Sequence, residues 1–294
     1  MTPFVIFLIA ISTFMHAGWN LLARYDRSES AFYNKMLIVT ILIGFFPAVF
    51  SEINTHSLTL TAWLCVIGSG FSAGMYLFFL ARAFEASDFT VVYPVARSLP
   101  VIFIAFADVM RGRYLTGFGW AGILLVASGC VLVPLRSFGD ISPQKYFNRA
   151  SLWMLFAAMG TVGYTLLDKI AAEVVQQGPG TAARYGYMYF AISYIPYVLM
   201  FQYFKPREKT ASSITSGWKL AIPAAFLSFG AYWLILWAYQ LSPFASYIVA
   251  FRQFSIVIGA VFAFLIYKEE GIALRLAGAS LMTTGLVLIA TLGR

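Results

Sequence analysis

Residues 218–241 read WKLAIPAAFLSFGAYWLILWAYQL, and this stretch decides the fold. It contains one charged residue, Lys219, close to its start. A transmembrane helix needs about 20 predominantly apolar residues to cross a hydrocarbon core roughly 30 Å thick. The stretch is therefore predicted to be a transmembrane helix.

Nine further stretches of the chain have the same character, and the links between them are short. Because backbone groups inside lipid must find their hydrogen bonds within the segment, each stretch is predicted to be a helix. The sequence therefore predicts an all-α membrane protein with ten transmembrane helices. The ten expected spans are Pro3–Leu22, Ala31–Phe50, Leu60–Ala81, Phe89–Met110, Thr116–Leu135, Ser151–Ile170, Thr181–Tyr203, Trp218–Leu241, Phe244–Ile266 and Ile272–Leu292.

The composition of the 294 residues supports this reading, since 61% are hydrophobic and only 11% are charged. A soluble domain has about 25% charged residues, so an ordinary soluble enzyme and a disordered chain are both excluded. The net charge of +8 comes from single basic residues in short loops, which indicates membrane orientation and no nucleic-acid partner. Cys65 and Cys130 each lie in an apolar run, so neither a disulfide nor a metal site is expected.

Basic residues are distributed unequally between the two sets of loops. With ten spans, both termini lie on one side of the membrane. Because positively charged loops stay in the cytoplasm, both termini are predicted to face the periplasm or the cell exterior. The terminal side holds Arg111, Arg113, Arg184 and Arg294, whereas the opposite side holds Arg24, Arg27, Arg136, Lys145, Arg149, Lys205, Arg207, Lys209 and Lys268.

The two halves of the chain resemble each other, which predicts a repeat in residues 1–140 and 150–294. Each half holds five predicted helices. Since five is odd, the second half must enter the membrane upside down, and inverted repeats bind substrate near the midplane between the halves. The matches are Ser72-x-Gly74-x-Tyr76 with Ser228-x-Gly230-x-Tyr232, Arg97 with Arg252, Gly122 with Gly278, and Gly129 with Gly285.

These features resemble the drug/metabolite transporter superfamily, in its EamA-type branch, and most closely amino-acid exporters of the YddG type. The resemblance is carried by His16-Ala17-Gly18-Trp19-Asn20, by Gly122 and Gly129, and by Lys268-Glu269-Glu270-Gly271 before the last span. The corresponding first-half stretch, Arg111-Gly112-Arg113-Tyr114, lacks the acidic residue of that pattern. The resemblance implies a bacterial inner-membrane exporter, in which the lipid bilayer and a small-molecule substrate are the partners.

Arg97 and Arg252 lie near the centres of their predicted spans, where an ionisable residue is costly and is a functional candidate. The planar fork of donors on arginine suits a carboxylate or a phosphate. Gln253, next to Arg252, is a further candidate for substrate binding. The alternative is structural, with each arginine bound to helix-end carbonyls or paired with Glu85, Asp108 or Asp168.

The first span has His16 and Asn20 and no acidic residue, which argues against a cation/proton antiporter of the small multidrug type. His16 is a candidate for substrate binding or titration near neutral pH. The alternative for His16 is a hydrogen-bonded residue that packs helices together.

Aromatic residues in the predicted spans supply the remaining candidates for a substrate site. Tyr232 and Tyr239 share one helix face by spacing. Such rings bind apolar side chains, or ammonium groups through cation–π contact. The alternative is that individual rings face lipid or form an interfacial belt. The aromatic candidates are Trp19, Tyr76, Tyr164, Tyr232, Trp237 and Tyr239.

Together these observations predict a transporter that moves an amino acid or related metabolite by alternating access, and no enzyme and no cofactor. A nucleotide-sugar or sugar-phosphate transporter of the same superfamily is the first alternative. It would need more cationic or polar residues beside the arginines. A membrane-embedded enzyme would need a clustered set of acids, histidines or metal ligands, which the sequence does not contain. A channel or a receptor-like scaffold is the third alternative.

Overall fold

The computed structural model describes residues 1–25, 29–86, 89–133, 135, 137, 139, 149–204, 218–258, 261 and 272–293. Within these residues the chain forms ten α-helices and no strand, so the prediction of an all-helical protein is confirmed there. In chain order the helices are α1 (Pro3–Tyr25), α2 (Glu29–Thr55), α3 (Leu60–Ala86), α4 (Phe89–Met110), α5 (Gly117–Leu132), α7 (Arg149–Val174), α8 (Pro179–Phe204), α9 (Trp218–Leu241), α10 (Ala245–Arg252) and α12 (Ile272–Leu292).

Part of the expected pattern of loop charges lies outside the described residues. These residues are Arg27, Arg136, Lys145, Lys205, Arg207, Lys209, Arg294 and the stretch Lys268–Gly271. The side chains of Arg24, Glu85 and Arg149 also lie outside the described part.

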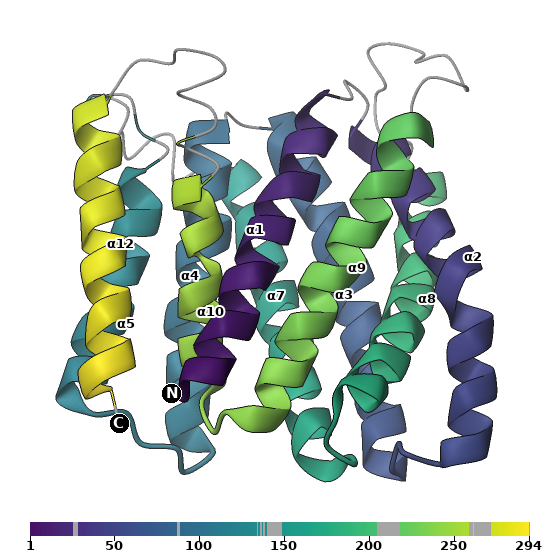
Figure 1. The fold of residues 1–294 in the computed structure, drawn as a ribbon. Coiled ribbons are helices and arrows are strands. Elements are labelled where there is room, and N and C mark those ends of the chain that lie inside the picture. Colours follow the sequence, from purple (N-terminus) through teal and green to yellow (C-terminus); the bar gives the residue numbers. More distant parts are fainter. Residues whose placement is uncertain are drawn as a thin grey trace.

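The helices stand side by side in one bundle, and both termini lie at the same end of it (Figure 1). We call this the terminal end. The short connections 56–59, 111–116, 175–178 and 242–244 also lie at this end, since successive helices alternate in direction.

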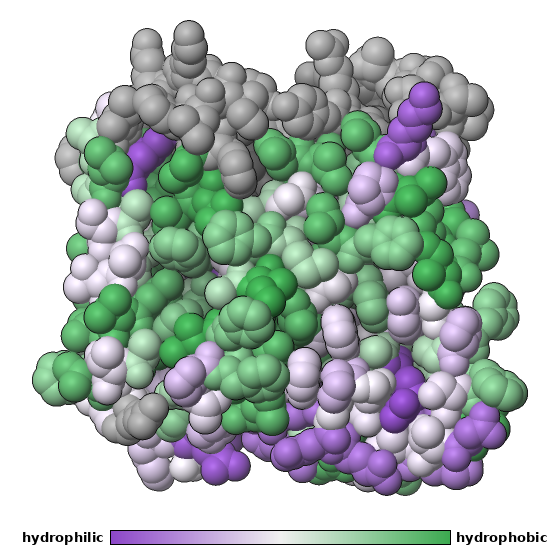
Figure 2. Space-filling view, viewed as in Figure 1, coloured by the Kyte–Doolittle hydropathy of each residue, from purple (hydrophilic) through white to green (hydrophobic). Residues whose placement is uncertain are grey.

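The flank of the bundle is apolar, as a lipid-facing surface requires. Large side chains such as Phe46, Phe50 and Leu64 are more than 60% exposed on it. Figure 2 shows hydrophobic residues over the side of the bundle and hydrophilic residues gathered at the terminal end. Among the described residues, α1, α2, α3, α9 and α12 are long and apolar enough to cross a membrane. A contiguous apolar surface of this extent marks a membrane-embedded region, and the chain is a multi-pass membrane protein.

Glycines allow α5 and α12 to approach each other closely. A Cβ atom built on Gly122 would lie 2.7 Å from the carbonyl oxygen of Gly285, and one built on Gly285 would lie 2.6 Å from that of Gly122. Thr116 caps the start of α5 by accepting from Gly119 N at 3.1 Å, and its hydroxyl donates to Leu292 O at the end of α12. Small residues at membrane helix interfaces bring backbones together in this way.

Candidate substrate site

The helix α10 forms the centre of the candidate site. It packs against α1, α4, α5, α7, α9 and α12, so it lies inside the bundle. Its first turn is anchored by Asp108 of α4, whose carboxylate accepts from Ser246 N at 2.8 Å. An acidic side chain at a helix N-terminus satisfies one of the unpaired amides there and favours the helix dipole.

The helical hydrogen bonding of α10 changes at Gln253, whose backbone remains right-handed helical (φ −65°, ψ −15°). Gln253 N contacts the carbonyls of both Val249 and Ala250, and Ile256 N bonds to Gln253 O three residues back. The helical path then continues as far as Ile258 in the described part of the chain.

Three side chains at this point of α10 bury polar atoms that lack hydrogen-bond partners among the described residues. They are Arg252 Nε, Gln253 Oε1 and Ser255 Oγ. Buried polar atoms are normally paired, and unpaired ones are costly, so each such atom calls for a ligand, a water molecule or a functional reason. Both Arg252 and Gln253 are predicted site residues, and the structure places them at this point of α10.

Arg252 lies over an aromatic ring and forms no ion pair with the described residues. Its Cζ is 5.5 Å from the centre of the Tyr232 ring on α9. A guanidinium over a ring face gains cation–π attraction, which is stronger where water is excluded. Tyr232 is only 4% exposed, so this contact is buried. The charge of Arg252 is therefore held by the ring and is not neutralised by a direct carboxylate contact among the described residues.

Arg97, the counterpart of Arg252, meets the predicted residues of the first span. Its Nη2 lies 3.1 Å from His16 Nε2, and Trp19 Nε1 donates to His16 Nδ1, also at 3.1 Å. Asn20 Nδ2 donates to His16 O at 2.7 Å within the same helix. His16 is 5% exposed, and its contact with Arg97 joins α1 to α4.

The ring of His16 cannot satisfy both of its neighbours at once. Trp19 and Arg97 are donor-only groups, whereas a neutral imidazole has one acceptor nitrogen. His16 therefore accepts from one of them at a time.

Aromatic rings from four helices form a cluster beside Arg252. Tyr189 of α8 stacks on Tyr232 with ring centres 4.4 Å apart, and Tyr164 of α7 lies 6.2 Å from both rings. Tyr76 of α3 contacts Tyr164 at 5.9 Å, and Phe190 contacts Tyr232 at 5.8 Å. Of these rings, Tyr189 and Phe190 were not anticipated from the sequence.

The remaining aromatic candidates lie apart from this cluster. Tyr239 shares the buried face of α9 with Tyr232, but one and a half to two turns nearer the terminal end, where its carbonyl accepts from Lys169. Trp237 is on another face of α9, where it contacts Phe4 at 5.2 Å and Trp233 at 6.3 Å. The structure thus groups Tyr76, Tyr164 and Tyr232, and leaves Trp237 outside the group.

Asp168 is a central residue of this region, although sequence reasoning weighed it only as an ion-pair partner. Its carboxylate accepts from the hydroxyls of Ser69 on α3, Tyr185 on α8 (2.8 Å) and Tyr232 on α9. Asp168 is 1% exposed. One carboxylate on α7 therefore connects four helices.

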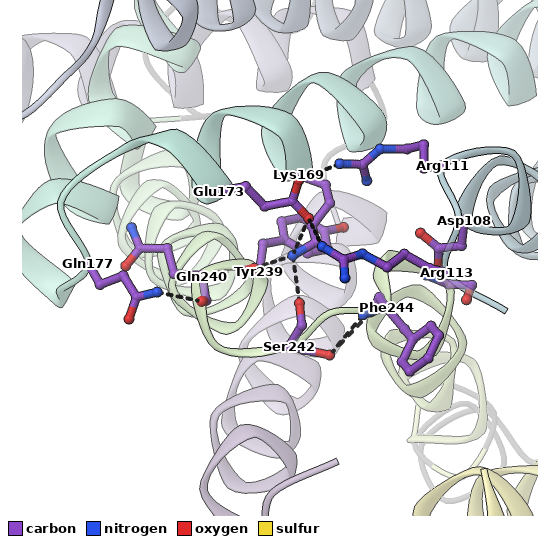
Figure 3. Close-up of polar contacts among 11 residues, drawn as sticks. Asp108, Arg111, Arg113, Lys169, Glu173, Gln177, Tyr239, Gln240, Ser242 and Phe244 are labelled. Atoms are coloured by element: carbon purple, nitrogen blue, oxygen red, sulfur yellow. Dashed lines mark hydrogen bonds and ion pairs between the residues drawn. The ribbon is translucent and has the colours of Figure 1, made fainter. Parts of the chain in front are cut away.

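A second polar cluster closes the terminal end of the bundle (Figure 3). Glu173 of α7 contacts Arg111 at 2.5 Å, Lys169 at 3.2 Å and Arg113 at 3.9 Å. Lys169 Nζ also donates to Tyr239 O at 2.8 Å and to Ser242 O at 2.6 Å, which are carbonyls at the end of α9. We call Arg111, Arg113, Lys169 and Glu173 the terminal network. It ties α7 to the α4–α5 and α9–α10 connections.

A metal centre finds no support in the described residues, which contain no group of three or more histidine, cysteine or acidic side chains placed to hold an ion. Cys65 and Cys130 are free and buried. The sequence expectation of no disulfide between them agrees with this.

Comparisons with known proteins place this geometry in context. A protein of known crystal structure is similar to the chain over 100% of its length and over 99% of its own, with 15% identity and a TM-score of 0.70. This likeness shows a shared fold. No curated protein sequence matches the chain. The profile of the EamA-like transporter family, a family of membrane transporters and not of enzymes, matches residues 3–135. This part of the chain is therefore similar in sequence to the EamA-like transporter family of the drug/metabolite transporter superfamily.

Proposed function

We propose that the protein transports amino acids or related small metabolites by alternating access, as an exporter of the bacterial inner membrane. The observation that carries this proposal is the set of unpaired buried polar atoms on α10, with Arg252 Nε among them, beside a wall of tyrosine rings. A guanidinium and an orphan amide oxygen suit the carboxylate and ammonium groups of an amino acid. The rings suit its apolar side chain.

The proposed site lies between two halves that we infer to be inverted repeats. The pattern of helix contacts supports this inference. Helix α1 packs on α9, and α7 packs on α3. Since α1 and α7 are the first helices of the two halves and α3 and α9 are the third, exchanging the halves converts one pair into the other. Helix α5 packs on α12. These are the last helices of the two halves, so exchanging the halves gives the same pair. In that pair Gly122 faces Gly285 and Gly129 faces Gly278, as a two-fold axis in the membrane plane requires.

We further propose that the terminal network is a closed gate. It joins α7 to both connections beside α10. In the proposed gate, these contacts block passage of the substrate toward the terminal end while the network is intact. Glu173 holds the network together because it contacts all three cations. Lys169 is 2% exposed, and a buried charge that loses its partner becomes costly.

Replacing Glu173 by glutamine is expected to shift the protein toward a state open at the terminal end. A cysteine introduced at Ser246, which is fully buried just inside the network, should then react several-fold faster with a membrane-impermeant maleimide. The Glu52→Gln variant is the matched control, since Glu52 is buried at the same end but binds Arg184 and Ser57 away from α10. Labelling of the protein without the introduced cysteine measures the background reaction of Cys65 and Cys130. Equal labelling rates in the Glu173→Gln and control variants would refute the gate.

The orientation is expected to place the terminal end outside the cytoplasm, because most basic loop residues lie on the opposite side. A fluorescent protein that matures only in the cytoplasm should therefore stay dark when fused to the C-terminus. The same fusion after an added eleventh transmembrane helix should fluoresce, which controls for expression. Bright fluorescence from the direct fusion would reverse the assignment, and the terminal network would then face the cytoplasm.

The substrate class is tested by ligand-dependent thermal stabilisation of the purified protein. A ligand at 100 times its Kd stabilises a protein by about 2.7 kcal/mol. We expect L-leucine and L-phenylalanine to raise Tm and leucinamide, which lacks the carboxylate, to do so much less. Stabilisation by glucose 6-phosphate or UDP-glucose in place of amino acids would favour a sugar-phosphate or nucleotide-sugar transporter. Equal stabilisation by leucine and leucinamide would contradict carboxylate recognition.

A further inference from the structure

Asp168 has no role in the proposed substrate site, yet it is buried and accepts hydrogen bonds from the side chains of three other helices. We propose that Asp168 is a proton-binding site, and that its protonation strengthens binding of an anionic substrate group at Arg252. The effect on substrate binding rests on the proposed function, whereas the proton site does not.

The surroundings of Asp168 favour a proton over a metal ion. Three hydroxyl groups, from Ser69, Tyr185 and Tyr232, point their hydrogens at the carboxylate, so lone pairs are turned away from it. No described cluster of ligands could hold a metal ion there. A protonated carboxyl group is a weaker acceptor than a carboxylate, so protonation weakens the three contacts. Because these contacts join α7 to α3, α8 and α9, protonation acts on helix packing.

We infer that a proton reaches Asp168 through a small cavity beside it. The cavity is partly open and runs between α7, α8 and α9. It is lined by Asp168, Ala171, Ala172, Val175, Thr181, Ala182, Tyr185, Leu236 and Gln240. The small side chains of Ala171, Ala172 and Ala182 leave this space, and Gln240 lies near its terminal end. The cavity lies on a different face of α7 from Lys169 and Glu173, so protons reach Asp168 from the terminal side while the terminal network remains closed to solutes.

Tyr232 connects the proton site with the substrate site. Its hydroxyl donates to Asp168 and its ring face lies under Arg252. Asp168 and Arg252 are close enough for their charges to interact. While Asp168 is ionised it offsets part of the Arg252 charge. Once Asp168 is neutral, Arg252 has an uncompensated charge, which favours a carboxylate ligand.

Other titratable groups face Asp168 or Arg252, and the test must separate them. At neutral pH the thiol and the phenols among them are uncharged. His16, which lies within electrostatic range of Arg252, is the competing site for a pH effect. The groups are Cys65 on α3, Tyr164 on α7, Tyr185 and Tyr189 on α8, Tyr232 and Tyr239 on α9, Arg252 on α10 and His16 on α1.

The first measurement needs no substrate. In infrared spectra of the full-length protein in lipid vesicles, the C=O band of a protonated carboxyl should grow on acidification. This band should be lost in Asp168→Asn and kept in Glu52→Gln, which makes the same carboxyl-to-amide change at another buried acid. An unchanged band in Asp168→Asn would overturn the proton site.

The second measurement is the pH dependence of L-leucine affinity. The wild-type protein should bind leucine roughly five- to a hundredfold more tightly when Asp168 is protonated, which is the usual range for coupled sites. The Asp168→Asn variant should bind tightly at every pH, as the protonated wild type does. A pH dependence that survives in Asp168→Asn would assign it to His16 and overturn the proposal. If the infrared band behaves as expected but the protein binds no amino acid, the proposed function is refuted and the proton site at Asp168 is retained.

Discussion

Replacement of Arg252 by glutamine is expected to weaken amino-acid binding and transport about ten- to a hundredfold while the protein remains folded. Arg252 Nε is buried and lacks a hydrogen-bond partner in the described chain, so the substrate carboxylate is the acceptor we assign to it. A hydrogen bond to a charged group contributes roughly 1.5–3 kcal/mol, which corresponds to this loss in affinity. Glutamine keeps polar donors at the site and removes the charge.

The matched control for this variant is Arg82→Gln. Arg82 also lies over an aromatic ring, 5.9 Å from the centre of Trp153, but on α3 away from α10. Transport rates in vesicles, with folding checked by size exclusion, should be near normal for Arg82→Gln and low for Arg252→Gln. Arg97→Gln should also reduce transport if the substrate draws a donor from the Arg97–His16–Trp19 group. Normal transport by both Arg252→Gln and Arg97→Gln would make these residues structural.

A large effect on stability is expected from a single added methyl group between α5 and α12. In Gly122→Ala the new Cβ would lie 2.6 Å from Ile289 Cγ1 and 2.7 Å from Gly285 O. The second contact is with backbone, which cannot move aside without separating the helices. Overpacking of this kind typically costs about 1–3 kcal/mol. Tm in detergent should therefore fall by several degrees.

Gly117→Ala is the control for this prediction, because a Cβ built there meets nothing within 4 Å. Gly117 is the first residue of the same helix, so its replacement by alanine raises helix propensity as Gly122→Ala does. Alanine in an unstrained position reduces the entropy of the unfolded chain and is neutral or slightly stabilising. An equal Tm for the two variants would show that α5 and α12 do not pack as described.

Much of the fold could be predicted from the sequence because lipid imposes one simple constraint on every helix. Apolar length alone located the helices, and residues 218–241 coincide with α9. The repeated glycines also gave a correct indication of close contact, since small residues are one of few ways to bring membrane helices together.

No local feature of the sequence indicated the change in helical hydrogen bonding at Gln253 in α10. Neither glycine nor proline occurs between residues 245 and 258. The change is a product of the surroundings of α10, which packs on six other helices. Tertiary packing of this kind is not encoded in hydrophobic periodicity.

Asp168 was underrated for a different reason. It lies two residues before the end of the expected span Ser151–Ile170, where an acidic residue is expected at the membrane–water interface. The helix α7 in fact continues to Val174, which places Asp168 about 9 Å from the helix end. Its three hydroxyl partners come from α3, α8 and α9, and no sequence spacing relates them. The spacing of aromatic residues on α9 was more informative, since it grouped Tyr232 with Tyr239, and both are buried.

The central claim is that the polar face of α10 is a substrate site reached alternately from the two sides of the membrane. Counterflow in proteoliposomes tests it most directly, with vesicles preloaded with unlabelled amino acid and given a trace of the labelled compound outside. We expect saturable, transient accumulation of labelled L-leucine or L-phenylalanine that is absent from empty vesicles and strongly reduced in Arg252→Gln. Flux that rises linearly with concentration and shows no stimulation by preloaded substrate would indicate a channel, and absence of flux for every amino acid would contradict the account.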